Sequence, residues 1–446
     1  MVVLLSTYEL GRPAFGVASA AAWLRTAGHV VHTVDLSRGP LPELWRDAAT
    51  LFAVHVPMHT ATRLAGPLLA RLRDARPDAT RVVFGLYAPL NERWLRAHGA
   101  THVLGVEAEA DLVAVAAGWP PPPTRTGLDL PRLAFQMPAR DDQGPLGGYA
   151  RLQTGDGTAR LAGYTEASRG CKHTCAHCPI VPVYQGTFRV VPVDVVMADI
   201  DQQVTAGARH ITFGDPDFLN GPGHARRVLD ALAVRHPDVS YDVTIKVEHL
   251  QSQPGMLDVL AATPCAFITS AFESFEPDVL RHLRKGHTPE QSREVLAACR
   301  TRGLALVPTF VAFTPWTTRA SYLGFLDHLR ALDLVDVVSP VQLALRLLLP
   351  AGSLLLAHAD IARVSRAFDA DSLAHPWTHD DPAVDALQAA VMAVVSGVAR
   401  TAPRRAIHAA ITSLAADAAH VTRRPFPPGR VASRATVPYL DEPWYC

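Results

Sequence analysis

The sequence lacks the features that mark several common classes of protein. Its 42 lysine and arginine residues balance 42 aspartate and glutamate residues, so no net charge attracts nucleic acid or anionic lipid. No apolar stretch reaches the roughly 20 residues of a membrane span, because Asp336 and Arg346 interrupt the long run over residues 334–356. The first ten residues carry no cationic leader, and Glu9 ends their apolar run too early for a signal peptide. We therefore expect a cytoplasmic protein with neither nucleic-acid nor membrane partners.

Cysteine is also scarce. Six cysteines among 446 residues are too few for a disulfide scaffold. Three of them, Cys171, Cys175 and Cys178, lie within eight consecutive residues. This distribution indicates a reducing, cytosolic compartment and a local role for the three clustered thiols.

The chain is long enough for two or three domains, since an ordinary domain has about 150 residues. In residues 1–118, short apolar runs alternate with amphipathic segments. The pattern predicts strands over residues 2–6, 29–36, 51–56, 81–86 and 101–105, with helices such as 17–27 and 62–74 between them. This order predicts an α/β protein whose first domain is a doubly wound, Rossmann-like parallel sheet.

A Pro-rich stretch separates this domain from the next. Residues 119–149 include four consecutive prolines and predict a linker with little regular structure. Residues 150–352 predict six parallel strands, at 163–166, 210–213, 241–246, 266–271, 305–313 and 337–345. Six such strands with crossover helices favour a partial TIM barrel with functional groups at the strand carboxyl ends. Residues 353–424 predict a helical C-terminal region, and residues 425–446 predict an extended, Pro-rich tail.

The clustered cysteines follow the first predicted barrel strand, in the segment EASRGCKHTCAHCP over residues 166–179. Three thiolates can hold three irons of a cubane and leave the fourth iron open to a small molecule. Zinc is an alternative, with His173 or His177 as the fourth ligand that a structural zinc site wants. Chance clustering of structural thiols is the other alternative. Three cysteines in a loop after a strand favour the iron-sulfur cluster.

This cysteine spacing resembles the signature of the radical S-adenosylmethionine (SAM) superfamily. In that family the open iron binds the amino and carboxylate groups of SAM, and reduction cleaves SAM homolytically. The resemblance implies a 4Fe-4S cluster held by Cys171, Cys175 and Cys178, SAM as a cofactor, and an electron donor such as flavodoxin or ferredoxin. The family usually places an aromatic residue beside the adenine just before the third cysteine, where this sequence has His177.

Further residues match the order of elements in that family. Gly214, Asp215 and Asp217 end the second barrel strand, where the family's Gly-Gly-Glu-like element binds the SAM amino group. A carboxylate facing an ammonium suits that role, although Gly and Asp are also ordinary turn residues. Glu273 and Ser274 end the fourth strand, at a position that resembles the family's ribose contact.

Three other polar residues are candidates for contact with SAM or substrate. Lys246, close to Glu248, ends the third strand, where a cation could meet the SAM carboxylate; a solvated ion pair at the barrel rim is the alternative. Gln342 and Arg346 lie on or just past the sixth strand, which in the resembled family borders the adenine and the active-site cavity. An arginine in the run LALRLLLP needs a partner if it is buried. We therefore expect Lys246 and Arg346 to be catalytic and Gln342 to contact SAM.

The N-terminal domain resembles the cobalamin-binding domain that precedes the barrel in one large class of radical SAM enzymes. The resemblance rests on Gly16 with the helix after it and on the segment GVEAE over residues 105–109. The Asp-x-His-x-x-Gly motif that supplies a lower cobalt ligand elsewhere is absent, as it is from many of these enzymes. Cobalamin is therefore a candidate cofactor, and a retained scaffold domain is the alternative.

The whole chain resembles a narrower group, the radical SAM proteins with a CUAEP or CCAEP tail, related to the radical SAM enzyme of arsinothricin biosynthesis. The segments that carry this resemblance include STYELGRPAFG, SRGCKHTCAHCP, HITFGDPDFLNGP, DVTIKVEHL and PVQLALRLLLPAGS. It implies transfer of a 3-amino-3-carboxypropyl group from SAM to a metalloid, with Cys446 in the active site. Proteins of that group continue past this cysteine, so a gene model truncated at a selenocysteine codon and a genuine terminus both remain open.

These patterns predict an enzyme that cleaves SAM reductively and uses the resulting carbon radical to modify a small substrate, as in natural-product biosynthesis. The sequence leaves open which sulfur–carbon bond breaks. A non-catalytic carrier of metal or cobalamin that kept the fold is the alternative from another functional class.

Overall fold

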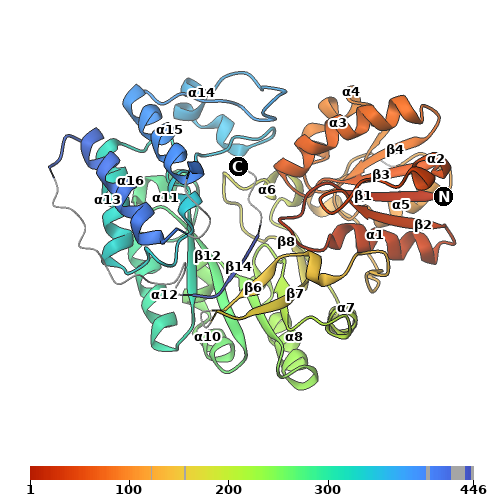
Figure 1. The fold of residues 1–446 in the computed structure, drawn as a ribbon, viewed down its shortest axis with the longest axis horizontal. Helices are drawn as coiled ribbons and strands as arrows, with labels where there is room; N and C mark the ends of the chain where they lie inside the picture. Colours follow the sequence, from red (N-terminus) through yellow and green to blue (C-terminus); the bar gives the residue numbers. More distant parts are fainter. Residues whose placement is uncertain (122, 155–156, 398–401, 423–436, 443–446) are drawn as a thin grey trace.

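The computed structural model describes the chain except residues 122, 155–156, 398–401, 423–436 and 443–446. Two α/β units lie side by side, each built on its own sheet (Figure 1). Among the described helices, none combines the length and the apolar character that crossing a bilayer requires.

The N-terminal unit is a five-stranded parallel sheet in the order β2-β1-β3-β4-β5. Alternate residues of β1 point to opposite faces, as in any strand: Val2 and Leu4 pack with one core, and Val3 and Leu5 with another. Helices α1 and α5 cover the first face, and α3 and α4 cover the second (Figure 1). The bounds are β1 Val2–Ser6, α1 Phe15–Thr26, β2 Val31–Asp35, α2 Glu43–Ala48, β3 Leu51–His55, α3 His59–Ala75, β4 Thr80–Phe84, α4 Glu92–Ala97, β5 His102–Val103 and α5 Glu109–Ala116.

The second unit is a seven-stranded sheet in the order β13-β12-β11-β10-β7-β6-β14. Its five central strands are parallel, whereas β6 and β14 add antiparallel to the β7 edge. The strands are β6 Arg151–Gln153, β7 Ala159–Thr165, β10 His210–Phe213, β11 Ser240–Thr244, β12 Cys265–Glu273, β13 Leu306–Phe310 and β14 Tyr439–Leu440. The helices between them are α7 Val193–Thr205, α8 Pro222–Arg235, α9 Val247–Ser252, α10 Pro254–Ala261, α11 Pro277–His282, α12 Pro289–Thr301 and α13 Arg319–Ala331.

The predicted fold class is confirmed, because a doubly wound sheet precedes a partial parallel barrel. Helices α14 Ala359–Val364, α15 Pro382–Gly397 and α16 Arg404–Ala418 make up the helical C-terminal region. The predicted tail also contributes a strand, β14, which the sequence did not indicate. Tyr439 pairs with Gln153 on β6, so the end of the chain returns to the beginning of the barrel.

The predicted sixth strand over residues 337–345 was wrong. Residues Pro340–Leu343 form a 3₁₀ helix, because a proline has no N–H for a ladder and has a fixed φ. The chain pairs in parallel with the segment after β13 only at Arg346, one residue past the predicted strand, through an isolated bridge to Phe313. Phe313 N donates to Leu345 O at 2.9 Å, and Leu347 N donates to Phe313 O at 2.8 Å.

Candidate functional site

The three clustered cysteines lie in one loop after β7, at the carboxyl end of the parallel strands. A short hairpin of β8 (Ser168–Gly170) and β9 (Phe188–Val190) flanks this loop. Gly170, just before Cys171, has φ +77°, and an added Cβ would lie 2.4 Å from Tyr184 Cδ1. Only glycine tolerates both conditions. Cys178 N donates to Cys175 O at 3.1 Å, which turns the chain back toward the first cysteine.

The three thiols interact electrostatically with one another. Burial, chiefly, raises the pKa of Cys171 to about 11 and that of Cys178 to about 12, and the neighbouring Cys175 raises both further. None of the cysteines in the described part of the chain forms a disulfide. Three neighbouring thiols in one loop fit a metal centre that would stabilise the thiolates together.

A buried acid–base group lies against the cysteine loop. Glu273 Oε1 accepts from His177 Nε2 at 3.1 Å and from Lys285 Nζ at 3.2 Å. Burial opposes ionisation of Glu273, but Lys285 and then His177 outweigh it and lower the pKa to about 2. Glu273 has φ +64°, which is uncommon for a residue with a side chain and is typical of functional sites. The predicted adenine and ribose residues therefore contact each other.

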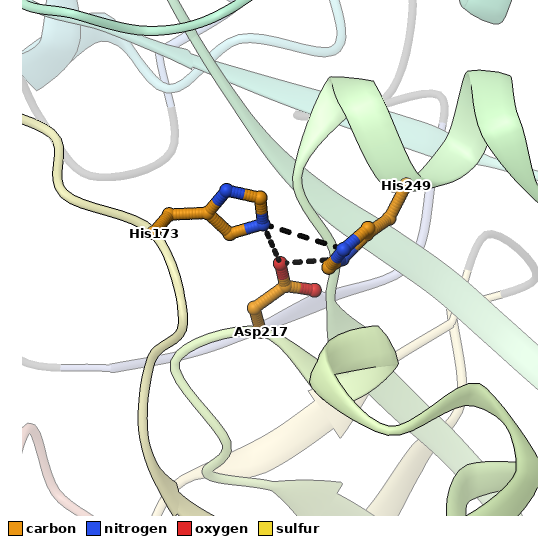
Figure 2. A group of neighbouring side chains, drawn as sticks. All are labelled: His173, Asp217 and His249. Carbon is orange, nitrogen blue, oxygen red and sulfur yellow. Dashed lines mark hydrogen bonds and ion pairs between the residues drawn. The ribbon is translucent and has the colours of Figure 1, made fainter. Parts of the chain in front are cut away.

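A second polar group lies near Cys171. His173 comes from the cysteine loop, Asp217 follows β10, and His249 lies on α9 (Figure 2). Asp217 Oδ2 lies 3.5 Å from His173 Nε2 and 2.7 Å from His249 Nδ1. Lys246 Nζ lies 3.2 Å from His173 Nδ1 and also pairs with Glu248.

Asp215 and Gly214, expected beside SAM with Asp217, are engaged within the protein. Asp215 accepts from Ala167 N at 2.9 Å and from Ser168 Oγ at 2.5 Å, and burial raises its pKa to about 7. A Cβ on Gly214 would lie 1.9 Å from Tyr164 Oη. Both residues therefore fix the start of the cysteine loop, and a contact with SAM stays a prediction for them.

The remaining predicted site residues form hydrogen bonds within the protein. Ser274 Oγ accepts from Glu276 N at 3.0 Å, and Gln342 Oε1 accepts from Phe310 N at 2.9 Å. Arg346 has the partners that burial requires: it donates at 2.6 Å both to Asp385 Oδ1 and to Trp377 O. Catalytic roles for Lys246 and Arg346 stay predictions. Cys446 lies outside the described residues.

Arg169, which the sequence analysis did not single out, joins the two units. Its guanidinium donates to Glu109 Oε1 at 2.7 Å and to Glu107 Oε2 at 3.2 Å, both in the N-terminal unit, and to Glu166 Oε2 at 3.0 Å. Tyr184 donates to Glu107 at 2.9 Å. The N-terminal unit thus holds a residue two positions before Cys171.

A partly open cavity of about 260 Å³ lies where the two units meet. Its walls come from loops that follow N-terminal strands, including Gly16, His55 and Gly105, and from Tyr164 and Arg169 of the barrel. His55 Nδ1 lies 2.8 Å from Glu9 Oε1. The resembled cobalamin-domain elements, Gly16 and residues 105–109, therefore line one cavity at the carboxyl edge of the sheet, the usual ligand position in such folds.

The sequence did not predict the roles of Lys285 and Arg169 or the partnership of His173 with His249. Lys285 belongs to no motif described above, and Arg169 stands within the cysteine motif without a spacing that relates it to its partners. His249 stands in the segment DVTIKVEHL and His173 in the cysteine motif, yet only the fold brings them together.

Comparison with known proteins identifies the class. Residues 165–317 match the radical SAM superfamily, over the cysteine loop and the central strands. The chain therefore carries a radical SAM domain, and this predicted domain is confirmed. The 4Fe-4S cluster and SAM are the cofactors that this domain implies.

Particular relatives are distant. The chain is similar to the ribosomal protein uS12 methylthiotransferase RimO of Sorangium cellulosum, with 25% identity over 198 residues and 40% of each chain covered. It is also similar to the tRNA-2-methylthio-N(6)-dimethylallyladenosine synthase of Fusobacterium nucleatum, with 26% identity over 188 residues. That match covers 39% of this chain and 40% of that protein. The chain thus covers well under two thirds of the length of these relatives.

Two solved structures are similar to this chain over most of its length. One is the cobalamin-dependent SAM radical enzyme OxsB with aqua-cobalamin bound, with a TM-score of 0.70 and 14% identity, covering 87% of this chain and 66% of that one. The other is the radical SAM methyltransferase TsrM from Kitasatospora setae, with a TM-score of 0.59 and 17% identity, covering 77% and 74%. At this identity the similarity establishes the fold.

Proposed function

We propose that this protein cleaves SAM reductively at a 4Fe-4S cluster held by Cys171, Cys175 and Cys178 and uses the resulting carbon radical to modify a small substrate. The observation that carries the proposal is the convergence of these three thiols in a single loop at the carboxyl end of the parallel strands. When bound, the cluster supplies the electron that breaks a sulfur–carbon bond of SAM.

The residues around the loop suit a charged ligand such as SAM. Glu273 and Lys285 form a buried ion pair that His177 of the cysteine loop contacts. Lys246, which interacts electrostatically with Cys171, presents a cation that complements the carboxylate of SAM. These side chains would bind and orient SAM without serving as iron ligands.

Anaerobic turnover with SAM and dithionite tests this proposal. Formation of 5′-deoxyadenosine would indicate hydrogen abstraction by a deoxyadenosyl radical, and formation of methylthioadenosine would indicate transfer of a 3-amino-3-carboxypropyl group. Cys175→Ser should abolish both products. Cys299→Ser is the matched control, because Cys299 is equally buried but lies in the core on α12. If the reconstituted parent forms neither product, the proposal is wrong.

The end of the described chain supports a role for the tail in the same site. Glu442 forms an ion pair with Arg12 of the N-terminal unit, and the Arg12 guanidinium lies 5.4 Å from the ring centre of Tyr164, a cavity residue. Residues 439–442 therefore lead toward the junction of the two units. Soft sulfur ligands prefer soft acceptors, so Cys446 would hold a metalloid such as arsenic. Deleting residues 444–446 should spare SAM cleavage and abolish substrate modification, and unaltered product formation would exclude the tail from the reaction.

The cavity between the units supports a second candidate function, binding of cobalamin. Glu9, Glu107 and Glu109 on its wall offer hydrogen-bond acceptors to the amide side chains of a corrin. Gly105 lies on the cavity wall and an added Cβ there has 3.6 Å of clearance from its nearest neighbour, so Gly105→Trp should place a bulky ring at that wall. Gly255→Trp, on an open helix surface, is the control. After incubation with hydroxocobalamin and gel filtration, we expect the absorbance of cobalamin to remain with the parent and the control and to be lost from Gly105→Trp. If the parent retains no cobalamin, this second function is excluded.

A further inference from the structure

His173, Asp217 and His249 form a group that could hold a metal ion separate from the cysteine cluster. One ligand atom from each lies within 4.8 Å of the others. The three residues come from different parts of the chain, the cysteine loop, the loop after β10 and helix α9, and converge on one point (Figure 2). Their convergence is therefore a property of the tertiary structure.

Two of the candidate ligand atoms are buried and have no hydrogen bond among the described residues. They are Asp217 Oδ2 and His249 Nδ1. The two atoms are 2.7 Å apart and form an ion pair that does not have the geometry of a hydrogen bond. Buried polar atoms outside a hydrogen bond are costly to desolvate, and a cation bound to both atoms would remove that cost. The other oxygen of Asp217 accepts from Leu219 N at 3.2 Å, which fixes the carboxylate.

The distances suit a transition-metal ion. Bonds of about 2.1 Å in tetrahedral or octahedral geometry place neighbouring ligand atoms about 3.0–3.4 Å apart. With Nδ1 as the ligand atom of His249, Asp217 Oδ2 lies 2.7 Å from that atom and 3.5 Å from His173 Nε2, which brackets this range. Two imidazoles and one carboxylate are the ligands of iron(II) sites with open positions and of catalytic zinc sites. Calcium and magnesium prefer oxygen ligands throughout.

Neighbouring residues would orient His173. Its Nδ1 accepts from Lys246 Nζ at 3.2 Å and lies 3.5 Å from Glu248 Oε2. A metal bound at Nε2 therefore requires a proton on Nδ1 that turns to Glu248 in place of the Lys246 contact. Lys246 contributes the opposing charge: its Nζ lies 3.2 Å from the same Nδ1 and is paired with Glu248. The ion pair between Lys246 and Glu248 reduces the repulsion that a second cation would experience.

A comparable group elsewhere in the described chain lacks these properties. His282, His358 and Asp360 also lie within ligand distance of one another. There, however, Trp316 Nε1 donates to Asp360 Oδ2 at 2.9 Å, and His358 Nε2 lies 2.9 Å from His282 Nδ1. Its polar atoms are already paired and its side chains are partly exposed, so it serves as the control.

We propose that His173, Asp217 and His249 bind one divalent first-row transition ion, zinc or iron(II), with open coordination positions beside the loop of the 4Fe-4S cluster. The site goes beyond the proposed radical function and does not depend on it. In this proposal Asp217 is a ligand of the metal ion and does not bind the SAM ammonium.

Zinc binding to the full-length, cluster-reconstituted protein tests the proposal, because mass spectrometry counts zinc and iron separately. We expect one tightly bound zinc in the parent and in His282→Ala. In His249→Ala and Asp217→Asn the zinc affinity should fall at least about 100-fold, since loss of a ligand exceeds the 10–100-fold cost of losing a group that only orients one. Absence of zinc from the parent, or equal binding in all variants, overturns the proposal.

A second measurement separates this site from the cysteines and from SAM. The Cys171→Ala/Cys175→Ala/Cys178→Ala variant should still bind one cobalt(II), with visible bands of nitrogen and oxygen ligation and no thiolate charge-transfer band. Circular dichroism establishes that each variant is folded. If Asp217→Asn lowers the affinity for SAM while zinc binding is unchanged, the group holds SAM directly and the metal site is excluded.

Discussion

Replacement of Glu273 by glutamine should destabilise the barrel strongly, because it leaves a buried cation without its partner. Glu273 and Lys285 are both less than 10% exposed, and their charged atoms are 3.2 Å apart. Removing one member of a buried ion pair typically costs about 3–5 kcal/mol. The pKa of Glu273 gives a similar magnitude: a decrease from 4.5 to about 2 corresponds to about 3 kcal/mol of stabilisation of the folded state.

The sign of this effect sets its pH range. The pKa of Glu273 is lower in the folded state than in the unfolded state, so its stabilisation is present above pH 4.5 and is lost as the pH falls toward 2. Urea unfolding at pH 7 therefore measures the full contribution. We expect the free energy of unfolding to fall by about 3 kcal/mol in Glu273→Gln. Glu276→Gln, three residues along the chain and exposed, should change it by less than about 0.5 kcal/mol.

A double-mutant cycle isolates the interaction. Lys285→Met alone should also destabilise, since it leaves the buried Glu273 carboxylate with His177 as its remaining side-chain partner among the described residues. The double variant Glu273→Gln/Lys285→Met should lose at least about 2 kcal/mol less than the sum of the single variants, because neither charge is then stranded. Strictly additive effects, or a cost below about 1 kcal/mol for Glu273→Gln, would refute the reasoning.

Three further outcomes follow from the same structure. Cys171→Ala should lose the absorbance of the cluster and its iron after anaerobic reconstitution, because one of three thiolate anchors is gone; wild-type iron content would contradict the ligand assignment. Burial, chiefly, raises the pKa of Glu166 to about 8. Near pH 6 the folded state therefore binds a proton that the unfolded state has released. The free energy of unfolding should fall by about 2 kcal/mol from pH 6 to 8 as this proton is lost. Urea titrations should show this loss in the parent and a flatter profile in Glu166→Gln; equal slopes would disprove the shift. Gly214→Ala should lower the melting temperature, because its Cβ would clash with Tyr164, whereas Gly324→Ala, on an open helix face, should not; equal melting temperatures would contradict the packing.

Local patterns predicted much of the fold. Apolar runs of four to six residues placed β1, β3 and β10 within one residue of their observed bounds. Such runs indicate a strand directly, since a strand buried on both faces needs continuous apolar residues. The same criterion gave a wrong prediction for the sixth barrel strand. The apolar run that starts at residue 337 contains Pro340, and the backbone forms a 3₁₀ turn there. Pairing with Phe313 begins only at Arg346.

The sequence by itself determined the class of this protein, because three cysteines with fixed spacing after a buried strand form a local motif. Its ligand atoms need only one loop to come together. The tertiary structure alone decided the surroundings of that loop. Lys285 reaches Glu273, Arg169 reaches Glu107 and Glu109, and His249 reaches Asp217, through contacts between residues 12 to 62 positions apart in the chain. No periodicity links such residues, since their approach depends on how the helices and strands of two units pack.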